Sequence, residues 1–380
     1  MIKLLDVCKI GGKAVKDFEG EKKYIATGDI IDNQIVSFEK VTYKNKPSRA
    51  NILIDINDVI FAKMQNTIKV LKANENNITN IYSTGFYSLT PGQNLSKDYL
   101  YYFLNSKSFN SQKDKNCSGA TQKALNNEGL EKILIKDLPS MEEQLKIVKK
   151  LSLLDELVNY KKNEINKLEE LIKSQFVEMF GNIKNNDKSW NCYDYIGNHC
   201  ILNPKKSEIN DLANIDVSFV PMQNVSEKGE IDSSNIKKLF DVKKGFTYFR
   251  ENDVLFAKIT PCMENGKGAV ARGLKNDIGF GSTEFHVIRP NDNINSVWLY
   301  TYTTFDSFRK DAEKKMTGSA GQKRVPISFF ENYKIAIPPI ELQNKFEAIV
   351  EQIDKQKFEF EKQLEKLEEL QASLMQEYFG

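Results

Sequence analysis

The chain has 380 residues, 40% of them hydrophobic, and a formal net charge of +2. This length suits two domains with separate cores, and the near-neutral charge lacks the strongly basic balance of a small nucleic-acid-binding domain. No run of about 18 apolar residues and no basic-then-apolar leader is present, so we predict no membrane span and expect a cytoplasmic protein. Two histidines, His199 and His286, leave little material for histidine-based catalysis or multi-histidine metal sites.

Residues 1–139 combine short β-branched and aromatic runs with turn signals. The stretches "ANILIDINDVIFAK" (50–63) and "NNITNIYSTGFYSLTPG" (76–92) are typical of strands, whereas "SKDYLYYFLNSKSFNSQ" (96–112) indicates helix. This first segment is therefore predicted to be a domain of mixed helix and strand.

Residues 140–181 predict one long helix. Pro139 suits a helix entrance, and Ser140 with Glu143 has the spacing of a capping box. Apolar residues then recur at intervals of three, four or seven, without Gly or Pro before the terminal "FG". A helix of about 40 residues is roughly 60 Å long, so this narrow apolar stripe requires a helical partner.

The same organisation then repeats. "NDVIFAK" (57–63) returns as "NDVLFAK" (252–258), and "KLEELIKSQFVEMFG" (167–181) returns as "KLEELQASLMQEYFG" (366–380). The repeat predicts a second domain at 182–338 and a second long helix at 339–380. The expected fold class is α+β, with two tandem pseudo-symmetric α/β domains separated by an antiparallel two-helix coiled coil. The alternative is two separate helices, each folded onto its own domain.

Charge differs between these segments. Lys and Arg outnumber Asp and Glu in both predicted domains, whereas acidic residues outnumber basic ones in both predicted helices. The difference is compatible with ordinary surface variation, or with domains that face phosphate and helices that face another partner.

Motifs for catalysis are missing from the sequence. It has no Gly-rich phosphate loop, no G-x-G-x-x-G, no H-E-x-x-H and no C-x-x-C. "NPKK" (203–206) lacks the second proline and the aromatic residue of the N-P-P-[FY] methyltransferase motif, which favours a turn. We therefore predict no catalytic, cofactor-binding or metal-binding residues in this chain.

Recognition of DNA is better supported than catalysis. Arg and Lys can read guanine, Asn and Gln can read adenine, and small residues let backbone amides approach phosphate. A single polar residue in a loop is usually just solvated, but here such residues recur at matching places in both copies. The predicted DNA-binding residues are Lys13, Lys46, Ser48, Arg49, Lys63, Gln65, Asn66, Thr67, Thr121, Gln122 and Lys123 in the first copy, and Lys205, Lys206, Lys258, Thr260, Asn265, Lys267, Ser319, Gln322, Lys323 and Arg324 in the second.

The order of several stretches resembles a known family. "NDVLFAKITPCMENGKGAVARGL", "GFGSTEFHVIRP", "WLYTY", "TGSAGQKRVP" and "ENYKIAIPPIELQNKFEAIV" are followed by a long helix, as in the DNA-specificity subunit of type I restriction-modification systems. The resemblance implies that each domain is a target recognition domain, which reads one half of a bipartite asymmetric site in double-stranded DNA. It further implies that the helices form a spacer coiled coil, which sets the distance between half-sites and docks the partner subunits.

The resemblance also implies partners. These are two copies of the methylation subunit and, in the full complex, restriction subunits that translocate and cut DNA. S-adenosylmethionine, Mg and ATP are expected only on those partners, since the specificity subunit of this family is not catalytic.

One departure limits the comparison, because the first copy has "MQNTIKV" where the second has "ITPCMENGKG". The two domains are therefore expected to read different bases.

Two other classes of protein remain open on sequence alone. One is a self-contained DNA methyltransferase or nuclease with embedded recognition domains, for which the chain offers no cofactor motif. The other is a coiled-coil scaffold whose globular ends bind proteins.

Overall fold

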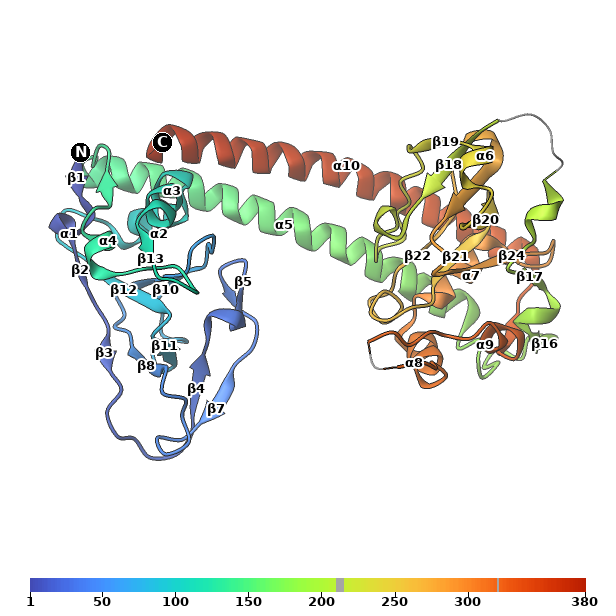
Figure 1. Ribbon diagram of the computed structural model, residues 1–380, viewed down its shortest axis with the longest axis horizontal. Coiled ribbons are helices and arrows are strands. Elements are labelled where there is room, and N and C mark those ends of the chain that lie inside the picture. Colours follow the sequence, from blue (N-terminus) through green and yellow to red (C-terminus); the bar gives the residue numbers. More distant parts are fainter. Residues whose placement is uncertain (210–214, 320) are drawn as a thin grey trace. The chain divides into compact units, whose positions relative to one another are not determined.

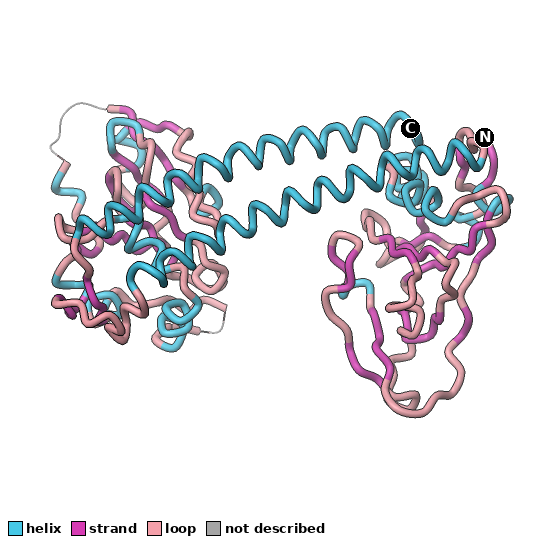
Figure 2. Tube along the Cα trace, turned by 180° about the vertical axis from the view of Figure 1, so that it is seen from behind, coloured by secondary structure: helices cyan, strands magenta, loops and turns pink. Residues whose placement is uncertain are grey.

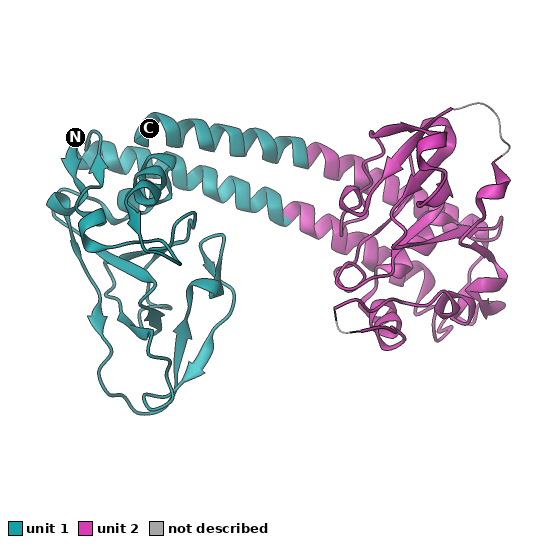
Figure 3. Cartoon of the chain, in the orientation of Figure 1, with its two compact units in different colours: residues 1–163, 361–380 teal, residues 164–360 magenta. Residues whose placement is uncertain are grey.

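A computed structural model describes residues 1–209, 215–319 and 321–380 (Figure 1). The chain divides into two compact units: unit 1 is Met1–Asn163 with Glu361–Gly380, and unit 2 is Glu164–Phe360 (Figure 3). The boundaries fall inside the two long helices, α5 (Met141–Phe180) and α10 (Ile340–Phe379), so each unit holds a mixed domain and part of both helices. The division into segments 1–139, 140–181, 182–338 and 339–380 stays a prediction. No helix in the described ranges is long and apolar enough to cross a bilayer.

Unit 1 is built on two main sheets. The first is antiparallel, in the order β10–β9–β12–β2, and the second has the order β3–β8–β11–β4–β7 with β4 and β11 parallel. The strands of the first sheet are β2 (Cys8–Ile10), β9 (Val59–Ala62), β10 (Val70–Lys72) and β12 (Phe86–Pro91), and those of the second are β3 (Lys13–Ala14), β4 (Lys22–Ile25), β7 (Glu39–Val41), β8 (Ala50–Leu53) and β11 (Ile81–Ser83). The smaller pairs are β1 (Ile2–Lys3) with β15 (Leu134–Ile135), β5 (Ile30–Ile31) with β6 (Gln34–Ile35), and β13 (Cys117–Ser118) with β14 (Ala124–Leu125), and the short helices are α1 (Leu4–Val7), α2 (Lys97–Asn105), α3 (Lys107–Lys115) and α4 (Asn127–Leu130).

Unit 2 repeats this topology, except that its second sheet has four strands in the described residues where that of unit 1 has five. Its first sheet has the order β17–β24–β21–β22, and its second has the order β19–β18–β23–β20 with β18 and β23 parallel. The bounds are β16 (Cys192–Tyr195), β17 (Cys200–Leu202), β18 (Asp216–Val220), β19 (Ile236–Lys238), β20 (Thr247–Arg250), β21 (Val254–Ala257), β22 (Gly268–Val270), β23 (Ile278–Gly281), β24 (Phe285–Pro290) and β25 (Lys334–Ile337), with helices α6 (Leu239–Val242), α7 (Ser296–Thr303), α8 (Asp306–Lys314) and α9 (Ser328–Glu331). The predicted α+β fold of two tandem, pseudo-symmetric domains is confirmed by this shared strand order.

The repeated heptapeptides form β9 and β21, each inside the first sheet of its unit. All four residues of each strand are buried. In β9, Val59 and Phe61 join the core that includes α2, and Ile60 and Ala62 join a second core shared with the other sheet. Core strands were predicted from alternating apolar residues, but both faces are covered, as a strand between helices and a sheet requires.

The long helices pair in opposite directions within each unit (Figure 2). In unit 1, Lys162 lies 2.8 Å from Glu368, and Lys150 donates to the Tyr378 hydroxyl at 3.3 Å. Residue numbers fall along α5 as they rise along α10, which confirms antiparallel pairing. Unit 2 shows the same order, since Glu169 pairs with Lys357 at 3.1 Å and the Phe176 and Phe346 ring centroids lie 5.5 Å apart.

The first turn of each long helix is attached to its domain by a buried glutamine. Gln144 accepts from Ser96 N at 2.8 Å and donates to the carbonyls of Asn94 and Pro139, each at 2.9 Å. Gln343 accepts from Asn295 N at 2.8 Å and donates to the carbonyls of Asn293 at 3.0 Å and Pro338 at 2.7 Å. The identical patterns fix the helix entrances in the same way, because an unpaired buried amide would be costly.

The capping box predicted for α5 is confirmed. Glu143 N donates to Ser140 Oγ at 3.3 Å, and Ser140 N donates to Glu143 Oε2 at 3.0 Å. The apolar stripe that the sequence predicts for this helix starts with Met141 and Leu145, but these two side chains are 40% and 58% exposed. The contact of this turn with the domain is made instead by Gln144, which is fully buried.

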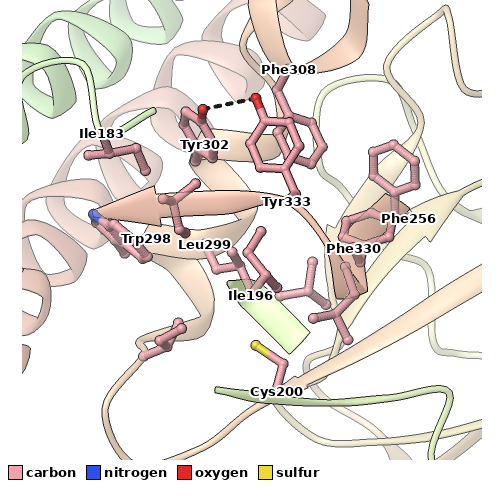
Figure 4. Close-up of a cluster of buried hydrophobic side chains, with 14 of the residues drawn as sticks. Ile183, Ile196, Cys200, Phe256, Trp298, Leu299, Tyr302, Phe308, Phe330 and Tyr333 are labelled. Carbon is pink, nitrogen blue, oxygen red and sulfur yellow. Dashed lines mark hydrogen bonds between the residues drawn. The ribbon is translucent and has the colours of Figure 1, made fainter. Parts of the chain in front are cut away.

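The largest core of unit 2 surrounds Trp298, which is fully buried (Figure 4). Phe256 of β21 and Phe330 of α9 pack edge to face with centroids 5.1 Å apart. The hydroxyls of Tyr302 and Tyr333 share a hydrogen bond at 3.3 Å. The aromatic packing anchors β21, whose C-terminal end leads into the loops described next.

Candidate nucleic-acid interface

In unit 1 two segments distant in sequence lie side by side beyond β9. Gln65 N donates to the Lys123 carbonyl at 3.0 Å, and Leu125 N donates to the Lys63 carbonyl at 2.9 Å. Met64 and Ala124 form an isolated β-bridge between the same segments. We call residues 63–67 and 121–124 loop pair 1. It contains the predicted residues Lys63, Gln65, Asn66, Thr67, Thr121, Gln122 and Lys123.

Unit 2 builds the same arrangement beyond β21. Thr260 N donates to the Lys323 carbonyl at 3.0 Å, and Val325 N donates to the Lys258 carbonyl at 2.9 Å. Ile259 and Arg324 form the corresponding bridge. We call residues 258–267, 317–319 and 321–324 loop pair 2. It contains the predicted residues Lys258, Thr260, Asn265, Lys267, Ser319, Gln322, Lys323 and Arg324.

A third segment supports each loop pair. Lys63 N donates to the Gly85 carbonyl at 2.9 Å, and Lys258 N donates to the Glu284 carbonyl at 2.9 Å. The backbone frame is therefore the same in both units, to the level of single hydrogen bonds. The side chains on this frame differ, which is the condition for two readers of different sequences.

Several side chains of the loop pairs face solvent. Asn66, Gln122 and Lys123 are exposed in loop pair 1, and Asn265, Gln322 and Lys323 are exposed in loop pair 2. Lys63 and Lys258 are half-buried, and burial lowers the pKa of both ammonium groups. Lys63 Nζ lies 4.0 Å from the centroid of the Tyr87 ring, which adds a cation–π contact.

The guanidinium of Arg324 in loop pair 2 is held by a carboxylate. Nε donates to Glu284 Oε2 at 2.9 Å and Nη2 donates to Glu284 Oε1 at 2.8 Å, in a bidentate ion pair. The matching positions in unit 1 are Ala124 and Gly85, so the pair is specific to unit 2. The donors with which arginine reads guanine thus point at Glu284.

The remaining predicted residues lie outside the loop pairs. Arg49 is nearby, since its carbonyl accepts from Thr84 N at 2.8 Å and the next residue, Gly85, holds Lys63. Ser48 is exposed beside it, Lys46 Nζ donates to the Ala50 carbonyl at 2.9 Å, and Lys13 forms an ion pair with Asp55 at 2.9 Å. Lys206 Nζ donates to the Lys243 carbonyl at 3.0 Å and Lys205 is exposed, so neither contributes to loop pair 2.

Two buried cations that were not predicted hold the loop pairs in place. Lys113 of α3 donates to the Thr67 carbonyl, and Arg309 of α8 donates to the carbonyls of Met263 and Gly266, each at 3.1 Å. By the repeat offset, Arg309 matches Asn110, one helical turn before Lys113. Positions three apart share a helix face, so either can support the loop. Sequence patterns gave no sign of this role, since both residues resemble ordinary helix-surface cations.

His286 connects the residue after loop pair 2, Val325, to the residue after β17, Asn203. Its Nε2 lies 2.7 Å from the Val325 carbonyl, and its Nδ1 lies 3.3 Å from Asn203 Nδ2. The carbonyl requires a proton on Nε2, so Nδ1 accepts from the Asn203 amide and the ring is neutral. Burial is the main cause that lowers its pKa from 6.5 to about 4.

Acid is therefore expected to weaken unit 2 through His286. Between about pH 6.5 and 4 the unfolded chain binds a proton that the folded chain does not, so stability falls as the pH falls, by about 3 kcal/mol at the lower end. His286→Gln keeps a donor for the Val325 carbonyl and removes the titration. Denaturant unfolding at pH 7 and pH 4.5 should show a smaller loss of stability for the variant. Equal losses in the two proteins would contradict this assignment.

Comparison with known proteins identifies the family. The family model for the type I restriction modification DNA specificity domain matches residues 1–170 and 202–371. The chain is 49% identical over 148 residues to the specificity subunit of the type I restriction enzyme EcoAI of Escherichia coli, covering 38% of this chain and 24% of that protein. It is 44% identical over 140 residues to the EcoEI specificity subunit of the same species, covering 36% and 23%.

The chain thus spans about a quarter of the length of these two relatives. A solved structure described as the structural basis of complex assembly and conformational transition of the type I R-M system has the same fold, with a TM-score of 0.57 and 19% identity over 100% of this chain and 96% of that one. Since the family model covers both copies of the repeat, the chain belongs to the family of type I restriction modification DNA specificity proteins.

Proposed function

We propose that this chain is the sequence-specific DNA-binding subunit of a type I restriction-modification enzyme. Each domain reads one half of a bipartite, asymmetric site. The observation that carries the proposal is the pair of equivalent loop frames, which have matching backbone hydrogen bonds and different side chains. A duplicated frame with changed side chains is suited to binding two different sequences on one duplex.

In each loop pair, lysine contacts phosphate and the amide side chains contact bases. Lys123 and Lys323 are exposed at equivalent places, where each can neutralise a phosphate in its half-site. Asn66 with Gln122, and Asn265 with Gln322, supply exposed amides suited to adenine. In this proposal Arg324 keeps its contact with Glu284 and shapes loop pair 2, and Lys13, Lys46, Ser48, Arg49, Lys205 and Lys206 act at the periphery.

The long helices serve as the spacer and as the docking surface for partners. We propose two methylation subunits, together with restriction subunits in the full complex, as the proteins bound. Chemistry belongs to those partners, which supply S-adenosylmethionine, Mg and ATP, and this chain is not catalytic. The acidic excess of residues 339–380 supports this division, because it repels DNA and leaves these helix surfaces to proteins. The complex would act in the cytoplasm, where its DNA lies.

Charge removal in loop pair 2, at Lys323, and beside loop pair 1, at Arg49, tests the proposal directly. Lys323→Ala and Arg49→Ala are expected to weaken duplex binding by about three- to tenfold at low salt, and to reduce the salt slope by about one for each phosphate that is no longer neutralised. Lys205→Ala, an exposed lysine outside the loop pairs, serves as the control and should change affinity less. Filter binding of the chain with its methylation subunits across a salt series measures all three. Absence of any salt-sensitive duplex preference would reject the DNA-binding function.

A further inference from the structure

Unit 1 contains a cavity of about 320 Å³ where α2 meets the two long helices. Its walls include Tyr101 and Tyr102 of α2, Asp155 of α5, and Glu368 and Gln371 of α10. Asn33, on the turn between β5 and β6, lines it as well. The cavity is separate from loop pair 1 and has no part in the proposed reading of DNA.

Two carboxylates, those of Asp155 and Glu368, line this cavity. Asp155 Oδ2 accepts from the Tyr102 hydroxyl at 2.6 Å, and Oδ1 accepts from the Gln371 amide. Across the part of the chain that the structure describes, no lysine or arginine is ion-paired with Asp155, and burial raises the pKa of its carboxyl. Glu368 is paired with Lys162 at 2.8 Å, and Lys107 also lines the wall. The cavity thus has a half-buried carboxylate whose hydrogen-bond donors are neutral.

The second copy of the repeat shows which groups surround the equivalent carboxylate in unit 2. By the repeat offset, Glu169 of unit 2 matches Glu368. Lys228 Nζ lies 3.0 Å from Glu169 Oε1, and Lys357 Nζ lies 3.1 Å from the same oxygen. Unit 2 therefore brings two ammonium groups from its own chain to the carboxylate that has one in unit 1.

Lys228 belongs to the turn that matches the one carrying Asn33. Val225 bridges Ile231 on either side of the unit 2 turn, as Ile30 pairs with Ile35 in unit 1. Asn33 is engaged elsewhere, since its Nδ2 donates to Asn105 Oδ1 at 2.8 Å and its Oδ1 accepts from Val70 N at 2.8 Å. The ammonium delivered by this turn in unit 2 is thus replaced by a neutral amide in unit 1.

A second difference opens the space itself. In unit 2 the Phe305 ring packs against Phe176, with centroids 5.2 Å apart. The matching residues in unit 1 are Ser106 and Met375, and both line the cavity. Replacement of a phenyl ring by a hydroxymethyl group leaves room beside Tyr102 for an aliphatic stem.

We propose that this cavity binds a primary ammonium group on an aliphatic chain, which takes the place that Lys228 occupies in unit 2. The ammonium pairs with Asp155 and Glu368, and its methylene groups lie against the tyrosine rings and Met375. A lysine side chain of a partner protein and a free polyamine share this chemistry. The inference does not depend on DNA reading, so the two succeed or fail separately.

Titration of the full-length chain with n-pentylamine, a mimic of the lysine side chain, tests this proposal by two-dimensional NMR or calorimetry. We expect saturable binding in the millimolar range, with shifts confined to the cavity residues, and none with n-pentanol, which lacks the charge. Asp155→Asn has the same shape without the charge: its Oδ1 can accept from the Gln371 amide while its Nδ2 donates to the Tyr102 hydroxyl, and it should weaken pentylamine binding about tenfold or more. The matched control Asp354→Asn, at the equivalent position of unit 2, should leave it unchanged.

A second variant keeps the test decisive if Asp155→Asn alters the fold. Asn33→Lys introduces the residue that unit 2 has on this turn, and it should exclude pentylamine by filling the site from within. Spermidine distinguishes the sources: affinity about tenfold above that of pentylamine assigns the site to a polyamine, and equal affinity assigns it to a single lysine. Absence of saturable pentylamine binding at about 20 mM, or equal affinity for wild type, Asp155→Asn and Asn33→Lys, would overturn the proposal.

Discussion

Lengthening both long helices together by about seven residues is expected to add about three unread base pairs to the target and to leave both half-sites unchanged. Seven residues add about 10 Å of helix, and one base pair occupies about 3.4 Å of the duplex. An insertion of one heptad also preserves the apolar seam between the helices. The insertions belong after Asn163 in α5 and after Phe360 in α10, so that the helix contacts inside each unit are kept.

Methylome sequencing of cells that carry the chain and its methylation subunits measures this result, because it reports both half-sites and the spacer together. The matched control inserts the same residues in α5 alone. In that variant Lys162 can still pair with Glu368, but the rest of α5 is one heptad out of register with α10, so pairs such as Glu169 with Lys357 cannot form at the same time, and methylation should be lost. An unchanged spacer in the double insertion would contradict the role of the helices as a ruler.

Arg309→Leu is expected to abolish methylation directed by the second half-site and to cost unit 2 about 3 kcal/mol of stability. The side chain donates to the carbonyls of Thr303 at 2.6 Å and of Met263 and Gly266 at 3.1 Å, and its guanidinium lies 4.3 Å from the Phe256 ring centroid. Burial lowers its pKa to about 10, so the group stays charged at neutral pH. Loss of the guanidinium leaves the three carbonyls without this donor, and each unpaired carbonyl lowers the free energy of unfolding by about 1 kcal/mol or more.

Amide hydrogen exchange of residues 259–267 should rise sharply in Arg309→Leu, while loop pair 1 stays protected. Arg309→Lys is the conservative control, and it should recover only part of the effect because one ammonium cannot reach all three carbonyls. Lys113→Met removes one donor from the Thr67 carbonyl in unit 1 and should have a smaller effect, confined to the first half-site. Normal methylation by Arg309→Leu would show that this cation does not position the loop.

Much of the architecture was predictable because its causes are local or periodic. The repeat at 195 to 200 residues follows from comparing the sequence with itself. The capping box of Ser140 and Glu143 and the apolar stripes of the long helices depend on residues at most a few turns apart. Core strands at the two heptapeptides follow from the same kind of pattern. These features require no knowledge of which distant segments meet.

The interface itself depended on contacts between distant segments. Loop pair 1 forms because residue 65 meets residue 123 through the backbone, and no pattern within either loop specifies that partner. For the same reason the sequence did not predict which predicted residues bind other groups of the chain: Arg324 forms an ion pair with Glu284, and Lys206 donates to the Lys243 carbonyl. Sequence marked the residue types that suit DNA, and tertiary structure decided which of them stand together.

Differences between the two copies were decided in the same way. Lys113 and Arg309 stand one helical turn apart in the repeat and yet perform the same support, which only their buried hydrogen bonds reveal. Likewise, the exchange of Phe305 for Ser106 and of Lys228 for Asn33 becomes a cavity only when α2, α5 and α10 converge. By itself the sequence determined two domains, two helices and their order, because the spacing of apolar residues within each segment predicts its helices and strands. Tertiary structure decided the loop frames, the engaged arginine and the cavity, because each is made by groups that chain folding alone brings within a few ångströms.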